Sequence, residues 1–302
     1  MLKLFAPCLN SFSIRSGDFA ETAVLLPKFL SDQGIQQVIA PLPTKTGELW
    51  TNLDRFKAVL YPFVTGQDGY EVKMQPHHWA AFGIALKHIH STALPPTLAQ
   101  ALPQETFTDR WREFVKTILA QLGEMQFDDP VAGETAVLLK TNQAVILDLV
   151  DRAERLAQAA QAQPLEFVVC HADIHAGNIL ITLDDTFYIV DWDTLLLAPK
   201  ERDLMYIGAG LLGNWYSPQE EAALFYPAYG QTAIDQNLLA YYRYERIVQD
   251  IAAFCEQLLF TQEGGADRAQ SLRYLRSSFL PNHTIAIAYQ SDKTQSGCWS
   301  SF

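Results

Sequence analysis

Hydrophobic residues recur at helical spacing over several long stretches of this chain. Trp79, Phe82, Leu86 and Ile89 lie three or four positions apart, which predicts a helix over residues 77–90 with one apolar face. The same spacing predicts further helices over residues 111–122, 133–162, 238–259 and 268–279. The later part of the chain is therefore expected to be mainly helical.

Short apolar segments with β-branched and aromatic residues predict strands. Three of these segments lie close together in the sequence, at residues 167–170, 179–181 and 187–190. Two more stand nearer the N-terminus, at residues 37–40 and 58–61. We therefore expect one group of strands in the small N-terminal part and another between the helices.

A helix is also predicted close to the N-terminus, over residues 18–33. Asp18 and Glu21 have the spacing of a capping box at its start, and Gly34 follows its end. Pro27 lies inside this segment and implies a kink.

This order of elements predicts an α+β protein with two lobes of unequal size. The boundary falls near Gly66, so that residues 1–66 form a small mixed lobe with a hinge, and residues 67–302 form a larger, mainly helical lobe. A chain of 302 residues is long enough to bury a core in each.

Composition narrows the class of protein. With 22 Lys and Arg against 34 Asp and Glu, the formal net charge is -12, which argues against a nucleic-acid binder and suits a cationic small-molecule ligand. No stretch has the 18 or so uninterrupted apolar residues of a membrane span. The cysteines are scattered, at Cys8, Cys170, Cys255 and Cys298. Such spacing fits a reducing compartment, so we expect a cytoplasmic protein without a membrane partner.

The densest cluster of reactive side chains lies among the three neighbouring strands. His171 and Asp173 follow the first strand, and Asn178 comes five positions after that aspartate. This is the spacing of a kinase catalytic loop, and Asp191 ends the third strand, where a metal-binding aspartate belongs. We therefore expect Asp173 to be the catalytic base, and Asn178 and Asp191 to bind Mg²⁺ against the phosphates of ATP or GTP.

Other interpretations of these polar residues are weaker. Asp, Asn and Gly favour turns, but turns alone do not require the joint spacing of loop, strand and second aspartate. A zinc site at His175 lacks the further His and Cys ligands that it needs. Residues 208–213 match G-x-G-x-x-G, yet no strand–helix–strand alternation surrounds them, so close packing explains these glycines better.

Several segments together resemble the aminoglycoside phosphotransferase family, nearest to its spectinomycin phosphotransferase branch. They are residues 171–178, 191–193 and 198–204, with residues 61–63 similar to the linker between lobes and residues 242–250 similar to a helix of that branch. The likeness extends from about residue 12 to about residue 290. It implies a protein-kinase-like fold that transfers the γ-phosphoryl group of a nucleotide to a hydroxyl of an aminoglycoside, an aminocyclitol or a similar small molecule.

The resemblance also implies roles for individual residues. Asp203 would support the catalytic loop, and His171 would be structural. The linker backbone would bind the adenine, through Tyr61, Pro62, Phe63 and Val64. Contacts to a small cationic, hydroxyl-bearing substrate would come from acidic and aromatic residues: Asp193, Glu201, Trp215, Tyr242, Glu245 and Asp250. For Tyr242 and Glu245, packing and a solvated surface charge remain the alternative.

The N-terminal lobe departs from the family pattern. A kinase-like lobe has a glycine-rich hairpin and a lysine that pairs with a helix glutamate, which we expect to be Glu21. The position of that lysine falls on Ser13, near Arg15, and leaves no room for the hairpin. We therefore expect a shortened lobe. Two alternatives follow: a metabolic kinase of the choline or homoserine kinase type, and a catalytically impaired, pseudokinase-like binding protein.

Overall fold

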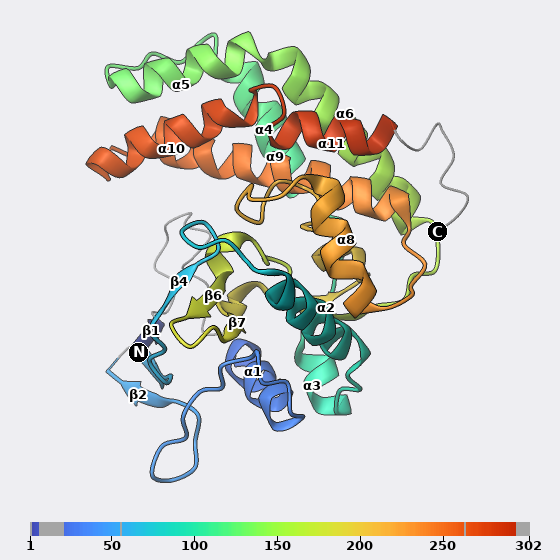
Figure 1. The fold of residues 1–302 in the computed structure, drawn as a ribbon. Helices are drawn as coiled ribbons and strands as arrows, with labels where there is room; N and C mark the ends of the chain where they lie inside the picture. The colour runs from blue at the N-terminus through green and yellow to red at the C-terminus, as the bar shows by residue number, and fades with distance from the viewer. Residues whose placement is uncertain (1, 6–20, 55, 263, 294–302) are drawn as a thin grey trace. The chain divides into compact units, whose positions relative to one another are not determined.

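The computed structural model describes residues 2–5, 21–54, 56–262 and 264–293 (Figure 1). The chain divides into two compact units, of which unit 1 comprises Met1–Glu105 and Glu166–Thr232, and unit 2 comprises Thr106–Leu165 and Ala233–Phe302. These units are not the two lobes expected from the motifs. The lobe boundary near Gly66 stays a prediction.

The described residues of unit 1 form three small antiparallel sheets. The first has the order β1–β3–β2, from β1 (Leu2–Phe5), β2 (Thr51–Leu53) and β3 (Phe56–Leu60). The second has the order β4–β6–β7, from β4 (Gly66–Asp68), β6 (Ile179–Thr182) and β7 (Phe187–Ile189). The third pairs β5 (Val168–Cys170) with β8 (Leu196–Ala198).

The strands predicted from apolar segments are present, with one exception. Residues 37–40 form no strand, because only Val38 bridges to Ile189 and no second strand continues the ladder. The strands β1, β2, β4 and β8 were not predicted. Strands β2 and β4 are mostly polar, so no apolar segment marks them.

The helices of unit 1 are α1 (Thr22–Asp32), α2 (Pro76–Ser91), α3 (Pro96–Ala101), α7 (Glu201–Leu204) and α8 (Pro218–Tyr229). Helix α2 buries the apolar face that its spacing predicted, and it lies beside α8 (Figure 1). Gly83 permits this close approach, because a Cβ there would lie 2.7 Å from the backbone of Phe225 and Tyr229. Helix α1 contains Pro27 and ends before Gly34, which has φ +88°. The predicted start at Asp18 lies outside the described residues.

Unit 2 is built around one long helix. Helix α9 (Gln236–Phe260) packs against α4 (Arg110–Gln121), α5 (Pro130–Thr141), α6 (Gln143–Gln161), α10 (Gly265–Ser278) and α11 (Thr284–Lys293). Leu149, Val150 and Val248 are fully buried in the shared core. None of the helices in the described part of the chain is long and apolar enough to span a membrane.

The single helix predicted over residues 133–162 is wrong, because two helices occupy this region. They meet at Asn142, whose side-chain amide donates to the Leu138 carbonyl at 2.8 Å. Asparagine side chains compete in this way with the helical hydrogen bonds of the backbone. The apolar spacing continues through the break, so it does not reveal it.

Candidate active site

The structure brings Asp173, Asn178 and Asp191 into one hydrogen-bonded frame. Strands β6 and β7 pair with Ile179 opposite Ile189, so that Asn178, just before β6, and Asp191, just after β7, lie at the same end of the hairpin. The Val190 N–H donates to the Asn178 carbonyl at 2.9 Å. The Asn178 amide in turn donates to the Asp173 carbonyl at 2.8 Å.

The expected catalytic loop (residues 171–178) is held by a fully buried carboxylate. Asp203 accepts hydrogen bonds from the N–H groups of His171 at 3.0 Å and Ala172 at 2.7 Å. His90 Nε2 lies 3.1 Å from the same carboxylate, and His90 Nδ1 lies 2.8 Å from the Tyr229 hydroxyl. Burial opposes ionisation of Asp203, but the hydrogen bonds from His90 and Ala172 outweigh it and lower the pKa of this carboxyl.

These bonds act on a strained part of the loop. Ala172 has φ +69°, in the left-handed region that costs a residue with a Cβ about 1 kcal/mol or more. The two N–H groups that Asp203 binds belong to Ala172 itself and to the residue before it, so Asp203 makes the contacts that a loop-supporting residue needs.

His171 ties the loop to the end of β7. Its Nδ1 accepts from the Asp173 N–H at 3.2 Å, so the ring proton lies on Nε2, which donates to the Val190 carbonyl at 2.9 Å. Burial lowers the pKa of His171 and favours this neutral form. Because Asp191 follows Val190, one imidazole fixes the spacing between the expected base and the expected metal ligand.

Asp191 and Asn178 fit a magnesium ion by their chemistry. Asp191 is exposed and has φ +66°, a left-handed conformation that aspartate adopts more readily than most residues. The Asn178 amide nitrogen is committed to the Asp173 carbonyl, which leaves its oxygen available as a ligand. Mg²⁺ prefers a few such protein oxygens and completes its shell with phosphate and water.

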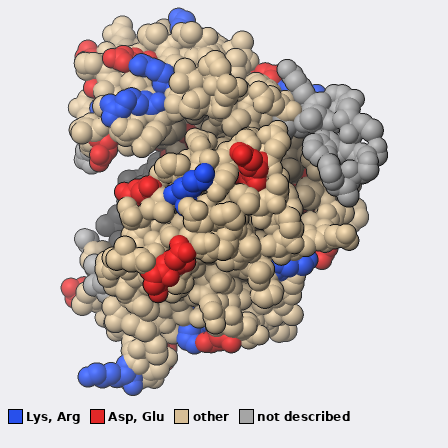
Figure 2. All heavy atoms as spheres, viewed as in Figure 1, with Lys and Arg blue, Asp and Glu red and all other residues tan. Residues whose placement is uncertain are grey.

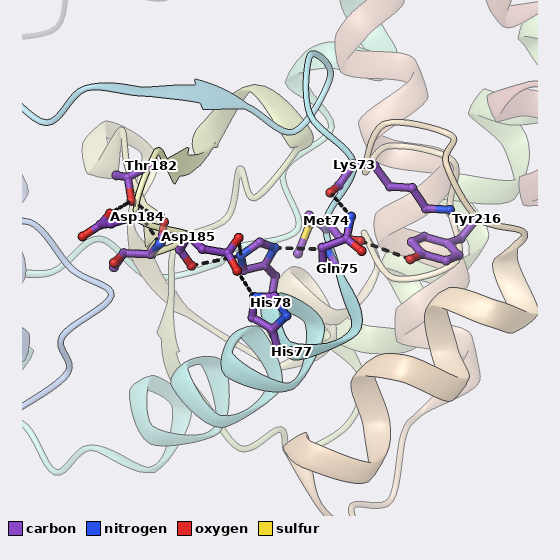
Figure 3. A network of polar contacts seen from close by, with 10 residues as sticks. Lys73, Met74, Gln75, His77, His78, Thr182, Asp184, Asp185 and Tyr216 are labelled. Atoms are coloured by element: carbon purple, nitrogen blue, oxygen red, sulfur yellow. Dashed lines mark hydrogen bonds and ion pairs between the residues drawn. The ribbon is translucent and has the colours of Figure 1, made fainter.

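A second set of contacts anchors the far end of the β6–β7 hairpin to the start of α2 (Figure 3). Buried His78 places Nε2 at 3.1 Å from the Asp185 carbonyl, and its Nδ1 accepts from the Gln75 N–H at 3.0 Å. His77 Nε2 lies 2.7 Å from the Asp185 carboxylate. Because the His78 Nδ1 is an acceptor, its Nε2 carries the proton, which makes this cluster a hydrogen-bonded tie rather than a metal site.

The glycine-rich segment at residues 208–213 packs against the catalytic loop. The Ala176 N–H donates to the Leu211 carbonyl, and the Ala176 carbonyl accepts from the Gly69 N–H, both at 2.9 Å. Gly208 and Gly213 have positive φ values of 72° and 94°, as turns require. Close packing, rather than a dinucleotide site, explains this segment.

The other residues expected to bind the nucleotide lie between β3 and β4 and at the start of α1. Tyr61, Pro62, Phe63 and Val64 connect β3 to β4, and Phe63 is 78% exposed. Glu21 is exposed at the start of α1, and its carbonyl accepts from Val24 and Leu25. Ser13 and Arg15 lie outside the described residues. Adenine binding by the linker and the pairing of Glu21 therefore stay predictions.

The six predicted substrate residues differ in exposure. In unit 1, Asp193 is exposed, Trp215 is 42% exposed, and Glu201 is buried with Lys200 at 3.2 Å. In unit 2, Tyr242 is buried, and Glu245 is buried in an ion pair with Arg112. Asp250 pairs with Arg246 at 3.0 Å. Their contact with a substrate stays a prediction.

Two neighbours of the site were not predicted from the sequence. The Tyr206 hydroxyl lies 3.2 Å from Asp173 Oδ1, and His90 binds Asp203. Both are far from the motif in the sequence, at 33 residues from Asp173 and 113 residues from Asp203 respectively. Neither belongs to a spacing pattern that indicates catalysis.

Comparison with known proteins identifies the family to which this chain belongs. Residues 20–245 match the model of the phosphotransferase enzyme family, and the chain belongs to that family. The crystal structure of spectinomycin phosphotransferase APH(9)-Ia in complex with ADP and spectinomycin is 36% identical, with a TM-score of 0.85, over 92% of this chain and 84% of that one. Its AMP-bound complex is 35% identical, with a TM-score of 0.83, over 95% and 86%.

A curated relative is more distant. Protein StrN of Streptomyces griseus is 26% identical over 178 residues, which are 58% of this chain. The matched region spans 55% of StrN, about half its length. The predicted family and the kinase-like α+β fold are confirmed, and the enzyme class is that of phosphotransferases acting on hydroxyl groups.

Proposed function

We propose that this protein transfers the γ-phosphoryl group of ATP or GTP to a hydroxyl of a spectinomycin-like aminocyclitol. The observation that carries the proposal is the joint frame of Asp173, Asn178 and Asp191. It occurs in a chain 36% identical to an enzyme solved with ADP and spectinomycin. Because the proposed reaction requires ATP or GTP, we propose that the protein acts in the cytoplasm.

Each residue of the frame has a distinct task in this reaction. Asp173 orients the acceptor hydroxyl and takes its proton as the oxygen attacks the γ-phosphorus. Asn178 and Asp191 would hold Mg²⁺, which when bound offsets the negative charge of the phosphates. His171 and Asp203 keep the loop in the geometry that aligns these groups.

The nucleotide is proposed to bind at the end of unit 1 that carries the linker. The backbone of Tyr61, Pro62, Phe63 and Val64 would bond the adenine edge, and the exposure of Phe63 is compatible with a role against a ligand. Glu21 would pair with a cation that orders the phosphates. Both assignments rest on the family pattern.

Charge favours a cationic acceptor. The chain has a net charge of -12. On the face that Figure 2 shows, basic and acidic side chains lie among each other, and the described residues form no broad basic surface there of the kind that nucleic acid requires. Among the predicted contacts in unit 1, exposure favours Asp193 and Trp215 over the buried Glu201.

An acceptor screen tests this proposal. The purified protein is incubated with Mg-ATP or Mg-GTP and with spectinomycin, a 2-deoxystreptamine aminoglycoside, choline or homoserine, and phosphorylated product is identified by mass spectrometry. We expect phosphospectinomycin. Phosphocholine or phosphohomoserine alone would instead establish a metabolic kinase. Absence of both product and calorimetric binding of Mg-ATP would indicate a pseudokinase-like protein.

A further inference from the structure

Tyr206 reaches the catalytic loop from the segment after α7. It is fully buried, and its hydroxyl lies 3.0 Å from the Ala172 carbonyl and 3.2 Å from Asp173 Oδ1. Both partners are acceptors, whereas a tyrosine hydroxyl has a single proton to donate. The proton is therefore shared by the two acceptors or passes from one to the other.

The contact with Asp173 is more than the buried Tyr206 hydroxyl needs. A buried tyrosine hydroxyl needs one partner, and the Ala172 carbonyl supplies it. Contact with Asp173 adds a bond to one chosen carboxylate oxygen. The other oxygen, Oδ2, lies 3.7 Å from His175 Nε2. The Tyr206 bond therefore falls on one defined oxygen of a side chain that is 23% exposed.

The short segment from Asp203 to Tyr206 binds both N–H and carbonyl groups of the loop backbone. Asp203 accepts from the N–H groups of His171 and Ala172, and Tyr206, three residues later, donates to the Ala172 carbonyl. The Tyr206 N–H donates to the Asp203 carbonyl at 3.3 Å. The hydroxyl is therefore held in fixed register with the loop that it contacts.

We infer that Tyr206 is a positioning residue for Asp173, a role that rests on the proposed function of Asp173 as base. While the carboxylate is ionised, the Tyr206 hydroxyl donates to Oδ1 and fixes the rotamer in which Oδ2 receives the substrate proton. As the acceptor O–H bond breaks, its proton moves to Oδ2. The new O–P bond forms as the bond from γ-phosphorus to the nucleoside diphosphate breaks. The Tyr206 proton stays on its own oxygen and turns toward the Ala172 carbonyl.

The direct test is the titration of Asp173 in the whole protein labelled with [4-¹³C]aspartate and saturated with Mg-ADP, so that the proposed metal ligands are occupied. Its carboxyl signal is assigned by its loss in Asp173→Asn. In Tyr206→Phe we expect the midpoint to move to higher pH by about half a unit to one unit, because a donor to the ionised form is lost. An unchanged midpoint would overturn the inference, and this readout does not depend on turnover.

Kinetics with the acceptor found by the screen give the functional consequence. In Tyr206→Phe, kcat should fall about tenfold, and the KM for nucleotide should stay within about twofold. The acidic limb of the pH profile of kcat should move to higher pH, as the Asp173 midpoint does. The matched control is Tyr289→Phe, which removes a tyrosine–carboxylate bond of 2.7 Å to Asp148 in unit 2. A fall in kcat with an unmoved pH profile would reduce Tyr206 to a packing role and contradict the inference.

A second substitution keeps the ring and the hydroxyl in place. 3,5-Difluorotyrosine at position 206 has a more acidic hydroxyl, which is a stronger donor, so the Asp173 midpoint should move to lower pH. Opposite shifts in the two variants support the inference, and shifts of the same sign contradict it. If Tyr206→Phe moves the midpoint but the wild-type protein phosphorylates no acceptor, the proposed function fails while the contact stands.

Discussion

At the scale of single residues, the site depends on Asp203, a carboxylate without solvent exposure that accepts two backbone N–H groups and contacts His90. Asp203→Asn removes the charge and replaces one acceptor oxygen with an NH₂ group. That donor would then face the donor groups that now bind the carboxylate. We expect the free energy of unfolding, measured in urea, to fall by about 3 kcal/mol. The control Asp32→Asn removes a more exposed acid paired with Lys28 and should change it by about 0.5 kcal/mol. Equal losses would show that Asp203 does not hold the loop.

The pH dependence of stability should reveal the neutral His171. Burial lowers its folded pKa, so the unfolded chain binds a proton first as pH falls below about 6.5. The free energy of unfolding should therefore decrease from pH 7 toward pH 5.5, with a contribution from this residue of up to about 1.4 kcal/mol per pH unit. The lowered pKa of Asp203 affects the free energy of unfolding only below about pH 4.

His171→Gln isolates that contribution. It keeps a side-chain donor and acceptor but removes the titration, so the slope between pH 7 and pH 5.5 should be shallower than in the wild type. A slope of wild-type steepness in this variant would assign the pH dependence to other groups.

Two thiols should be inert in the folded protein. Burial raises the pKa of Cys255 to about 12 and that of Cys170 well above its ordinary value. At pH 8 neither provides the thiolate that alkylation needs. Peptide mass spectrometry should find both unmodified by iodoacetamide in native buffer and modified in urea. Native labelling as fast as in urea would contradict the packing around them.

At the scale of elements, the β6–β7 hairpin carries both expected metal ligands and is tied to α2 by His78 (Figure 3). His78→Ala should lower the free energy of unfolding by about 2 kcal/mol, since a buried ring and its hydrogen bonds are lost. Hydrogen exchange in the β6–β7 turn should also become faster. His88→Ala, an exposed histidine of the same helix, is the control. Equal exchange in both variants would show that the tie does not order the hairpin.

The elements and the site were predictable to different degrees. Helix α2 and the strands β6 and β7 follow from local apolar spacing, and the Asp173-to-Asn178 interval is local too. The break at Asn142 and the missing strand at residues 37–40 depend on hydrogen bonds that periodicity does not record. Folding alone brings Tyr206 to the loop and His90 to Asp203, so no sequence spacing indicates them.

At the scale of the whole molecule, three observations support the proposed phosphoryl transfer to a cationic acceptor. They are the family, the arrangement of the site and the acidic composition. The chain belongs to the phosphotransferase enzyme family, and the loop, hairpin and α7 segment that frame the site all lie within unit 1. Unit 2 is a separate helical body around α9. We therefore propose that the phosphoryl-transfer step takes place in unit 1, with Asp173 at its centre.

The most direct test of this account compares phosphoryl transfer by the wild type and by Asp173→Asn, using [γ-³²P]ATP, Mg²⁺ and spectinomycin. Asp32→Asn serves as the surface control. We predict labelled spectinomycin from the wild type and the control, and a rate about a thousandfold lower in Asp173→Asn, because the base is lost while the fold is kept. Transfer by Asp173→Asn at the wild-type rate would contradict the assignment of Asp173 as the base.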